Sequence, residues 1–292
     1  MDIPANLSGA ALLAALAGLG LIVGVLTGLF GVGGGFMVTP LLRVLFGVPY
    51  SLAVGSSLTF IIGTSASGVS RHLRLGNVEV KGTLILAGGG MCGATLGGRL
   101  HEFLRGLLAG GGRDDFTAMM HGLFIVVLLT TAWLVARDPR PSGRGKTLLQ
   151  RVRLGPRVSL PQANLEHVSL PGLCAAGMLV GLLTGMLGIG GGVLLMPVLL
   201  VVVGLTAHQA VGTSLGVVLM ASIAGTIEHA RHGHVNLWIA MMMLAGSAVG
   251  VQIGAWLCGR LHARRLRGYF AVLVLVVAVV LAADLATMIV RG

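Results

Sequence analysis

Long apolar segments follow one another along almost the whole chain, and they constrain its fold more than any other feature. The first set lies at about 8–30, 34–47, 51–70, 79–100 and 116–136. The second set lies at about 170–187, 191–203, 208–227, 235–257 and 268–290. Most approach the ~20 residues that cross the hydrocarbon core of a bilayer. Because backbone polar groups in lipid must be satisfied within each segment, these segments predict helices. We therefore expect an all-α polytopic membrane protein.

The charged residues are too few to cover a water-soluble body of this size. They make up 10% of the 292 residues, against roughly 25% in ordinary soluble domains. The net charge is +11, but the Arg residues lie between apolar segments and do not line one face. That arrangement is typical of loops that orient a protein in a membrane. The expected partner is the lipid bilayer, and no nucleic acid is expected.

The two halves of the chain repeat one pattern at a constant offset. The segment GVLTGLFGVGGGFMVTPLL at 24–42 resembles GLLTGMLGIGGGVLLMPVL at 181–199, and Thr27 aligns with Thr184, so that the offset is 184 − 27 = 157. The same offset joins AVGSSL at 53–58 to AVGTSL at 210–215, and His72 to His229. Such a register indicates duplication. We expect a first membrane repeat at 1–136, a basic linker at 137–168 and a second membrane repeat at 169–292.

The linker and the segment count predict opposite orientations for the repeats. The linker is the most basic loop, which favours the cytoplasmic side. Each repeat has a Gly-broken helical hairpin followed by three transmembrane helices, so each crosses the bilayer an odd number of times. The second repeat is then inverted, a recurring design of secondary transporters. Both termini are expected on the periplasmic side.

Glycine-rich strings interrupt the apolar pattern once in each repeat, as GVGGG at 31–35 and GIGGG at 188–192. A helix that resumes after each string has free N–H groups and about half a positive charge at its N-terminus, which together attract a small anion. Close helix packing is the alternative explanation for these glycines. The predicted substrate-binding glycines are Gly31, Gly33, Gly34, Gly35, Gly188, Gly190, Gly191 and Gly192.

Side chains near the strings extend the candidate site. Ser56, Ser57, Thr213 and Ser214 could donate to an oxyanion, or could instead form N-caps or helix–helix hydrogen bonds. Thr27 and Thr184 precede the breaks and are expected to bond their own backbone, while Pro40 and Pro197 are expected to kink the short helices. Asp284 is an acid inside a late apolar segment, where carboxylates often carry coupling ions.

Other chemistries find little support in the sequence. The glycine strings do not complete a dinucleotide fingerprint, since Phe36 and Val193 stand where its last glycine would be. The GKT string at 145–147 does not complete a P-loop, since Arg140 stands where its first glycine would be. GTSLG at 212–216 matches GxSxG but lies in an apolar segment predicted to be helical, not at a strand-to-helix turn, and no HExxH occurs. We therefore expect neither an enzyme, nor catalytic residues, nor a cofactor. His229, His232 and His234 could bind a metal, but a polar interfacial turn is the favoured interpretation, and no metal site is predicted.

The glycine-containing motifs at 24–42 and 181–197, with AVGTSL and the RHGHVN turn, resemble the sulfite exporter TauE/SafE family of membrane permeases. The resemblance implies a secondary permease for small sulfur-containing anions, of the sulfite, sulfonate or sulfoacetate class. It also implies the bacterial inner membrane, where such a permease would work by alternating access around the two breaks. The alternatives are a divalent metal cation transporter that uses the His cluster and a non-transporting membrane assembly protein.

Overall fold

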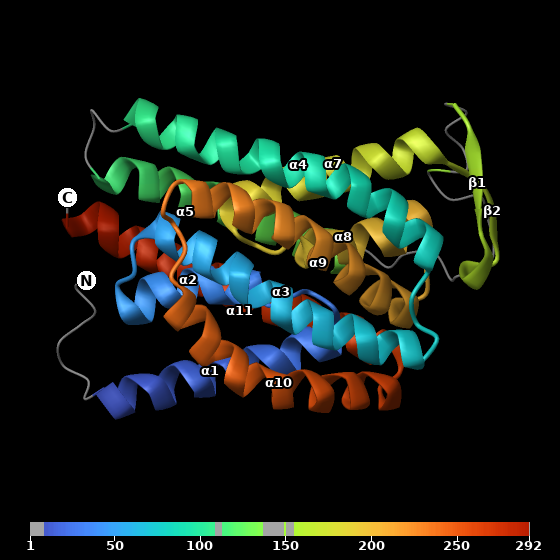
Figure 1. The fold of residues 1–292 in the computed structure, drawn as a ribbon, viewed down its shortest axis with the longest axis horizontal. Helices are drawn as coiled ribbons and strands as arrows, with labels where there is room; N and C mark the ends of the chain where they lie inside the picture. Colours follow the sequence, from blue (N-terminus) through green and yellow to red (C-terminus); the bar gives the residue numbers. More distant parts are fainter. Residues whose placement is uncertain (1–8, 109–112, 137–148, 150–154, 292) are drawn as a thin grey trace.

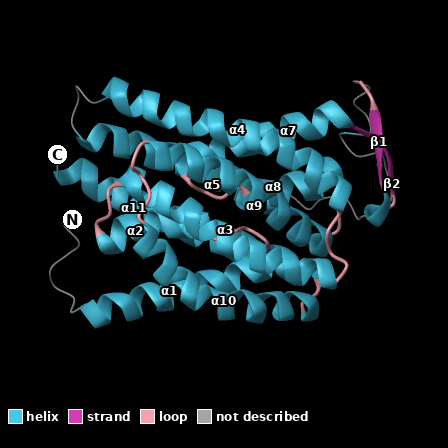
Figure 2. Ribbon diagram, viewed as in Figure 1, coloured by secondary structure: helices cyan, strands magenta, loops and turns pink. Residues whose placement is uncertain are grey.

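The computed structural model describes residues 9–108, 113–136, 149 and 155–291, and these are mostly helical (Figures 1 and 2). The first repeat contains α1 (Gly9–Phe30), α2 (Gly35–Phe46), α3 (Tyr50–Arg74), α4 (Val80–Leu107) and α5 (Arg113–Ala136). The second contains α7 (Leu170–Leu187), α8 (Gly192–Pro197), the π-helical η3 (Val198–Val203), α9 (Ala207–Arg231), α10 (Leu237–Arg260) and α11 (Ala263–Arg291). The predicted all-α membrane architecture is confirmed.

Seven helices in the described residues are long and apolar enough to cross a membrane. They are α1, α3, α5, α7, α9, α10 and α11. The 28-residue α4 is long enough but is not among them, because its many glycines and flanking charges lower its mean hydropathy. α2 and the continuous helical segment Gly192–Val203 are shorter apolar helices. These two lie directly after the glycine strings, as expected.

The end of the basic linker departs from the prediction that the whole chain is helical. Residues Arg157–Leu160 (β1) and Leu165–Ser169 (β2) form an antiparallel hairpin, joined by the 3₁₀ turn η2 at Pro161–Ala163. Its apolar residues Leu160 and Val168 are buried, and their burial stabilises the strand pair. The polar composition of the linker gave no indication of these strands in the sequence. Residues 137–148 and 150–154 of the predicted linker lie outside the described residues.

The hairpin is fastened to both repeats by hydrogen bonds at its tip. The backbone N–H of Ala163 donates to Glu79 Oε2 at 3.0 Å, and Gln162 Oε1 accepts from the N–H of Val80 at 3.1 Å. On the other side, Gln209 Nε2 donates to the carbonyl of Gln162 at 2.7 Å. The tip therefore joins the start of α4 in the first repeat to the start of α9 in the second.

Backbone conformation explains why glycine is required where the helices are broken. Gly31, Gly33 and Gly34 have φ values of 71°, 74° and 83°, in the left-handed region that side chains other than glycine rarely adopt. Their counterparts Gly188, Gly190 and Gly191 have φ values of 67°, 77° and 70°. The chain turns back at each break, so that α1 and α2 form one hairpin and α7 and α8 another (Figure 1).

The repeats are intertwined rather than side by side. α1 packs along α10 of the other repeat, and α4 packs along α7. These contacts are backbone to backbone: a Cβ atom at Gly24 would stand 2.7 Å from the Cα atom of Ser247, and one at Gly181 would collide with the carbonyl of Gly90. Close packing, the alternative explanation for glycine, therefore holds for glycines such as Gly24 and Gly181 that face these helix contacts.

In Figure 1, α1 begins at the end of the molecule that holds both termini, whereas α7 begins at the end that carries the β hairpin. Corresponding helices thus run in opposite directions. The hairpin and the termini lie at opposite ends of the molecule. Which end faces the cytoplasm stays a prediction.

Candidate functional site

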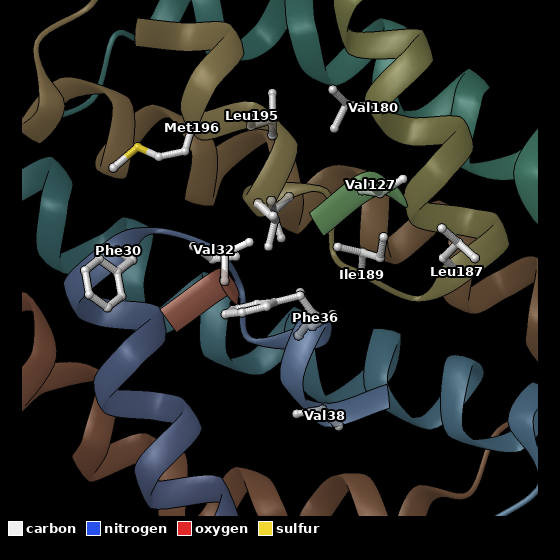
Figure 3. Packing of buried hydrophobic residues seen from close by; sticks show 14 of the residues in the cluster. Phe30, Val32, Phe36, Val38, Val127, Val180, Leu187, Ile189, Leu195 and Met196 are labelled. Carbon is white, nitrogen blue, oxygen red and sulfur yellow. The ribbon is translucent and has the colours of Figure 1, made fainter. Parts of the chain in front are cut away.

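The two glycine breaks meet in the buried interior. A Cβ atom at Gly35 would stand 2.5 Å from the carbonyl oxygen of Gly188, and one at Gly192 would collide with the backbone of Val32. Figure 3 shows Val32 and Phe36 of the first repeat packed in one cluster with Ile189 and Leu195 of the second. Each short helix therefore begins against the break of the other repeat.

Both short helices begin without a side-chain cap. Gly34 is the N-cap of α2 and Gly191 that of α8, and neither position has a capping hydrogen bond from a side chain. In α2 the carbonyl of Gly34 accepts from the N–H groups of Met37 and Val38, at 3.0 and 3.1 Å. The first amides of such a helix have no carbonyl partner in their own helix. Two positive helix ends are thus brought together in an apolar interior.

Ser57 and Ser214 each fasten a break to the opposite repeat. Ser57 Oγ donates to the carbonyl of Gly188 at 3.2 Å, and Ser214 Oγ donates to that of Gly31 at 2.6 Å. Thr39 Oγ1 contacts both groups of the first bond: it lies 2.8 Å from Ser57 Oγ and donates to the carbonyl of Gly188 at 3.1 Å. The two tethers are related by the offset of 157 residues, because 57 + 157 = 214 and 31 + 157 = 188.

The neighbouring hydroxyls make a second reciprocal pair of bonds. Ser56 Oγ accepts from the N–H of Asn236 at 2.9 Å, and Thr213 Oγ1 accepts from that of Glu79 at 3.0 Å. All four predicted hydroxyl ligands thus form helix–helix hydrogen bonds, the alternative that the sequence left open. They hold the breaks in place.

Six hydroxyls are buried in the described residues without any hydrogen-bond partner, and they belong to Thr27, Tyr50, Ser65, Thr131, Ser222 and Thr226. The expectation that Thr27 bonds its own backbone is therefore wrong, although Thr184 does so, donating to the carbonyl of Val180 at 2.8 Å. A buried polar group without a partner costs about 1–3 kcal/mol, so these hydroxyls are candidates for contacting a ligand.

The hydroxyls of Thr27 and Ser65, which have no partners, both lie beside the break of the first repeat. Thr27 Oγ1 is 2.8 Å from the position of a Cβ atom at Gly34, and Ser65 Oγ is 3.4 Å from that of a Cβ atom at Gly33. Sequence reasoning missed Ser65 and Ser222. Their spacing, 222 − 65 = 157, was the signal that could have found them.

The predicted helix-kinking prolines have different surroundings. Pro40 lies inside α2. Pro197 is the last residue of α8, and the helix continues from Val198 with π-helical bonding. Because proline lacks an N–H donor, it removes one bond from the regular α-helical ladder.

The His229 and His232 side chains contact backbone carbonyls, and that of His234 contacts Arg105. His229 Nε2 lies 2.7 Å from the carbonyl oxygen of Gly185, and His232 Nδ1 lies 3.0 Å from that of Glu228. No group of three His, Cys, Asp or Glu residues in the described parts of the chain could hold a metal ion. His72 makes the matching contact to the carbonyl of Gly28 at 3.1 Å, which makes the role of His229 structural.

Asp284, the predicted coupling residue, lies in α11 next to α5. Its Oδ2 atom is 3.7 Å from Nδ1 of His121. The sequence did not single out His121, because one histidine in an apolar segment is ordinarily a satisfied core residue.

Comparisons with known proteins add to this geometry. The model of the sulfite exporter TauE/SafE family matches residues 16–281. The chain is 30% identical over 259 residues to the probable membrane transporter protein YjnA of Bacillus subtilis, covering 88% of this chain and 95% of that protein. A probable membrane transporter protein of Xylella fastidiosa is 30% identical over 270 residues, covering 90% and 92%. No solved structure matches the chain significantly.

Proposed function

Because this chain belongs to the sulfite exporter TauE/SafE family, we propose that it is a secondary permease for small sulfur-containing anions, of the sulfite, sulfonate or sulfoacetate class. The family and the names of the relatives support a multi-pass membrane transporter. The substrate class is supported by the family description and by one structural observation. That observation is the meeting of two uncapped helix N-termini in the buried centre.

The proposed site holds the anion with backbone amides instead of charged side chains. Amides at the start of a helix point along its axis, and the helix dipole adds about half a positive charge. Their effect is stronger in an apolar interior than in water. The hydroxyls of Thr27 and Ser65, buried beside the first break without partners, supply further donors. A bound oxyanion would satisfy both the amides and the hydroxyls.

The proposed mechanism is alternating access, in which the repeats exchange roles around a central site. The tethers of Ser57 to Gly188 and of Ser214 to Gly31 join each break to the opposite repeat. A relative movement of the repeats therefore moves both breaks together. In the proposed orientation the linker is cytoplasmic, both termini are periplasmic, and the bilayer is the inner membrane of a bacterium.

The test is uptake of labelled sulfite, sulfoacetate and thiosulfate by purified protein in liposomes, with a labelled divalent metal as the comparison. Thr27→Val should weaken uptake about 10- to 100-fold at low anion concentration, since a hydrogen bond to a charged group contributes about 1.5–3 kcal/mol. Thr184→Val is the matched control and should change uptake less than about threefold, because the Thr184 hydroxyl already bonds the backbone.

Three results would contradict the proposal. Equal effects of the two substitutions would remove Thr27 from the binding site. Uptake of the metal but of none of the anions would favour the cation transporter. Absence of any flux from correctly folded protein would favour a non-transporting assembly protein.

A further inference from the structure

We propose that His121 and Asp284 form a proton-binding site, whose proton is the coupling ion of the permease. This inference rests on the proposed function. His121 belongs to α5 and Asp284 to α11, and the two side chains approach to 3.7 Å between Nδ1 and Oδ2. The His121 side chain is fully buried, and that of Asp284 is 21% exposed.

The pair lacks the additional bonds that a structural ion pair needs. In the described residues, the two ring nitrogens of His121 have no hydrogen-bond partner. The Oδ2 atom of Asp284 has none either. A distance of 3.7 Å is too long for a hydrogen bond. A buried ion pair stabilises a fold only when its remaining polar atoms are also satisfied. The pair therefore contributes little to stability and is suited to gaining and losing a proton.

α5 and α11 are the last helices of the two repeats, and they pack against each other. The pair therefore lies in a contact between the repeats.

Other titratable groups near the pair come from the first repeat. The ring of Tyr50 on α3 meets that of His121 edge-on, with centroids 5.7 Å apart, and its hydroxyl is buried without a partner in the described residues. His101 on α4 stacks on Tyr50 at 6.2 Å. The charge of Arg43 on α2 acts on His121. α9 of the second repeat also packs against α11 and carries His208, Glu228, His229 and Arg231. α1 and α8, which pack against α11 or α5, contain no titratable side chain.

The position of Arg43 explains how a proton here could affect the anion. α2 begins at the first glycine break with Gly35 and carries Arg43 in its last turn. α11 packs against α2, and α5 packs against α8, the short helix of the second break. A proton bound by the pair adds one positive charge to this contact between the helices. Both short helices thus contact the helices that carry the pair.

Two transport assays with labelled sulfite and sulfoacetate separate coupling from binding. Exchange of internal for external anion needs no net proton movement, whereas accumulation in a pH gradient does. If one proton accompanies each anion, a gradient of about one pH unit drives about tenfold accumulation. Asp284→Asn and His121→Gln should retain exchange and lose this accumulation. Glu102→Gln is the matched control, because it removes a carboxylate that pairs with Arg105 and lies 3.7 Å from Nδ1 of His234, and it should retain both.

Infrared spectroscopy of the purified protein tests proton binding without transport. Between pH 8 and pH 5, the wild type and Glu102→Gln should gain a protonated-carboxyl or imidazolium signal that Asp284→Asn loses. Absence of that signal in the wild type, or full accumulation by Asp284→Asn, would overturn the inference. Absence of anion exchange in the wild type would instead overturn the proposed function.

Discussion

At the scale of single residues, several polar side chains in the interior have a partner in the opposite repeat. Ser56, Ser57, Thr213 and Ser214 all bond backbone groups of the other half. These hydrogen bonds are required because a helix start or a break leaves backbone N–H and C=O groups without partners, and such groups need hydrogen bonds in an apolar interior. The few buried hydroxyls without partners are therefore informative, since the fold alone does not explain them.

His234 predicts a pH dependence of stability. It lies between α9 and α10, and burial, followed by the charge of Arg105, lowers its pKa below the ordinary value of 6.5. The unfolded chain therefore binds a proton here more readily than the folded protein. The stabilising contribution is present above pH 6.5 and is lost as the pH falls below it.

Thermal unfolding in detergent should accordingly show a lower Tm at pH 5 than at pH 7.5. His234→Asn, which copies the counterpart Asn77, should reduce that difference, because asparagine does not titrate. An unchanged difference in the variant would show that His234 does not contribute.

At the scale of elements, glycines line the contacts of α1 with α10 and of α4 with α7. Gly89 and Gly93 of α4 face the carbonyls of Cys174 and Met178 on α7, whereas Gly88 has no neighbour where its Cβ atom would stand. The close approach of the α4 and α7 backbones therefore depends on the glycines that lie on one face of the helix. Adjacent glycines in one helix have different roles.

Gly88→Ala and Gly89→Ala form a matched pair of substitutions. Gly88→Ala should be neutral or should stabilise by up to about 1 kcal/mol, since alanine favours a helix over glycine. Gly89→Ala should destabilise by about 1–3 kcal/mol, because the added methyl group overpacks the interface with α7. Tm in detergent measures both. Equal effects would contradict the asymmetry of this helix.

The sequence predicts these helices and breaks well where the apolar periodicity, the segment length and the internal repeat indicate the same element. The breaks at 31–35 and 188–192, and the short helices after them, follow from glycine strings that occur twice. The β hairpin was missed because four- and five-residue strands in a basic segment carry little signal. The pairing of His121 with Asp284 was also missed. It joins helices far apart in the chain, and the duplication offers no second copy to reveal it.

At the scale of the whole molecule, neither repeat is complete by itself. In the described structure, the glycine-lined face of α1 packs against α10, and that of α4 packs against α7 and α9, all of the other repeat. The tethers at the breaks also cross between the repeats. The structure therefore favours folding of the two halves together.

A chain divided within the linker, between residues 144 and 145, tests this dependence. The two fragments should copurify and show the helical contacts of the intact protein when they are coexpressed. Each fragment expressed alone should be degraded or aggregated, because its backbone-contact faces lack their partners. Stable, monodisperse single fragments would show that the repeats fold independently.

The hairpin tip joins Glu79 and Val80 to Gln209 at one end of the molecule, largely through backbone groups. At the opposite end of the described structure, Arg105 and Glu102 of the first repeat instead contact the His234 side chain of the second. Two identical ends would open with equal ease, and because these ends are held by different contacts, we expect them to open with unequal ease.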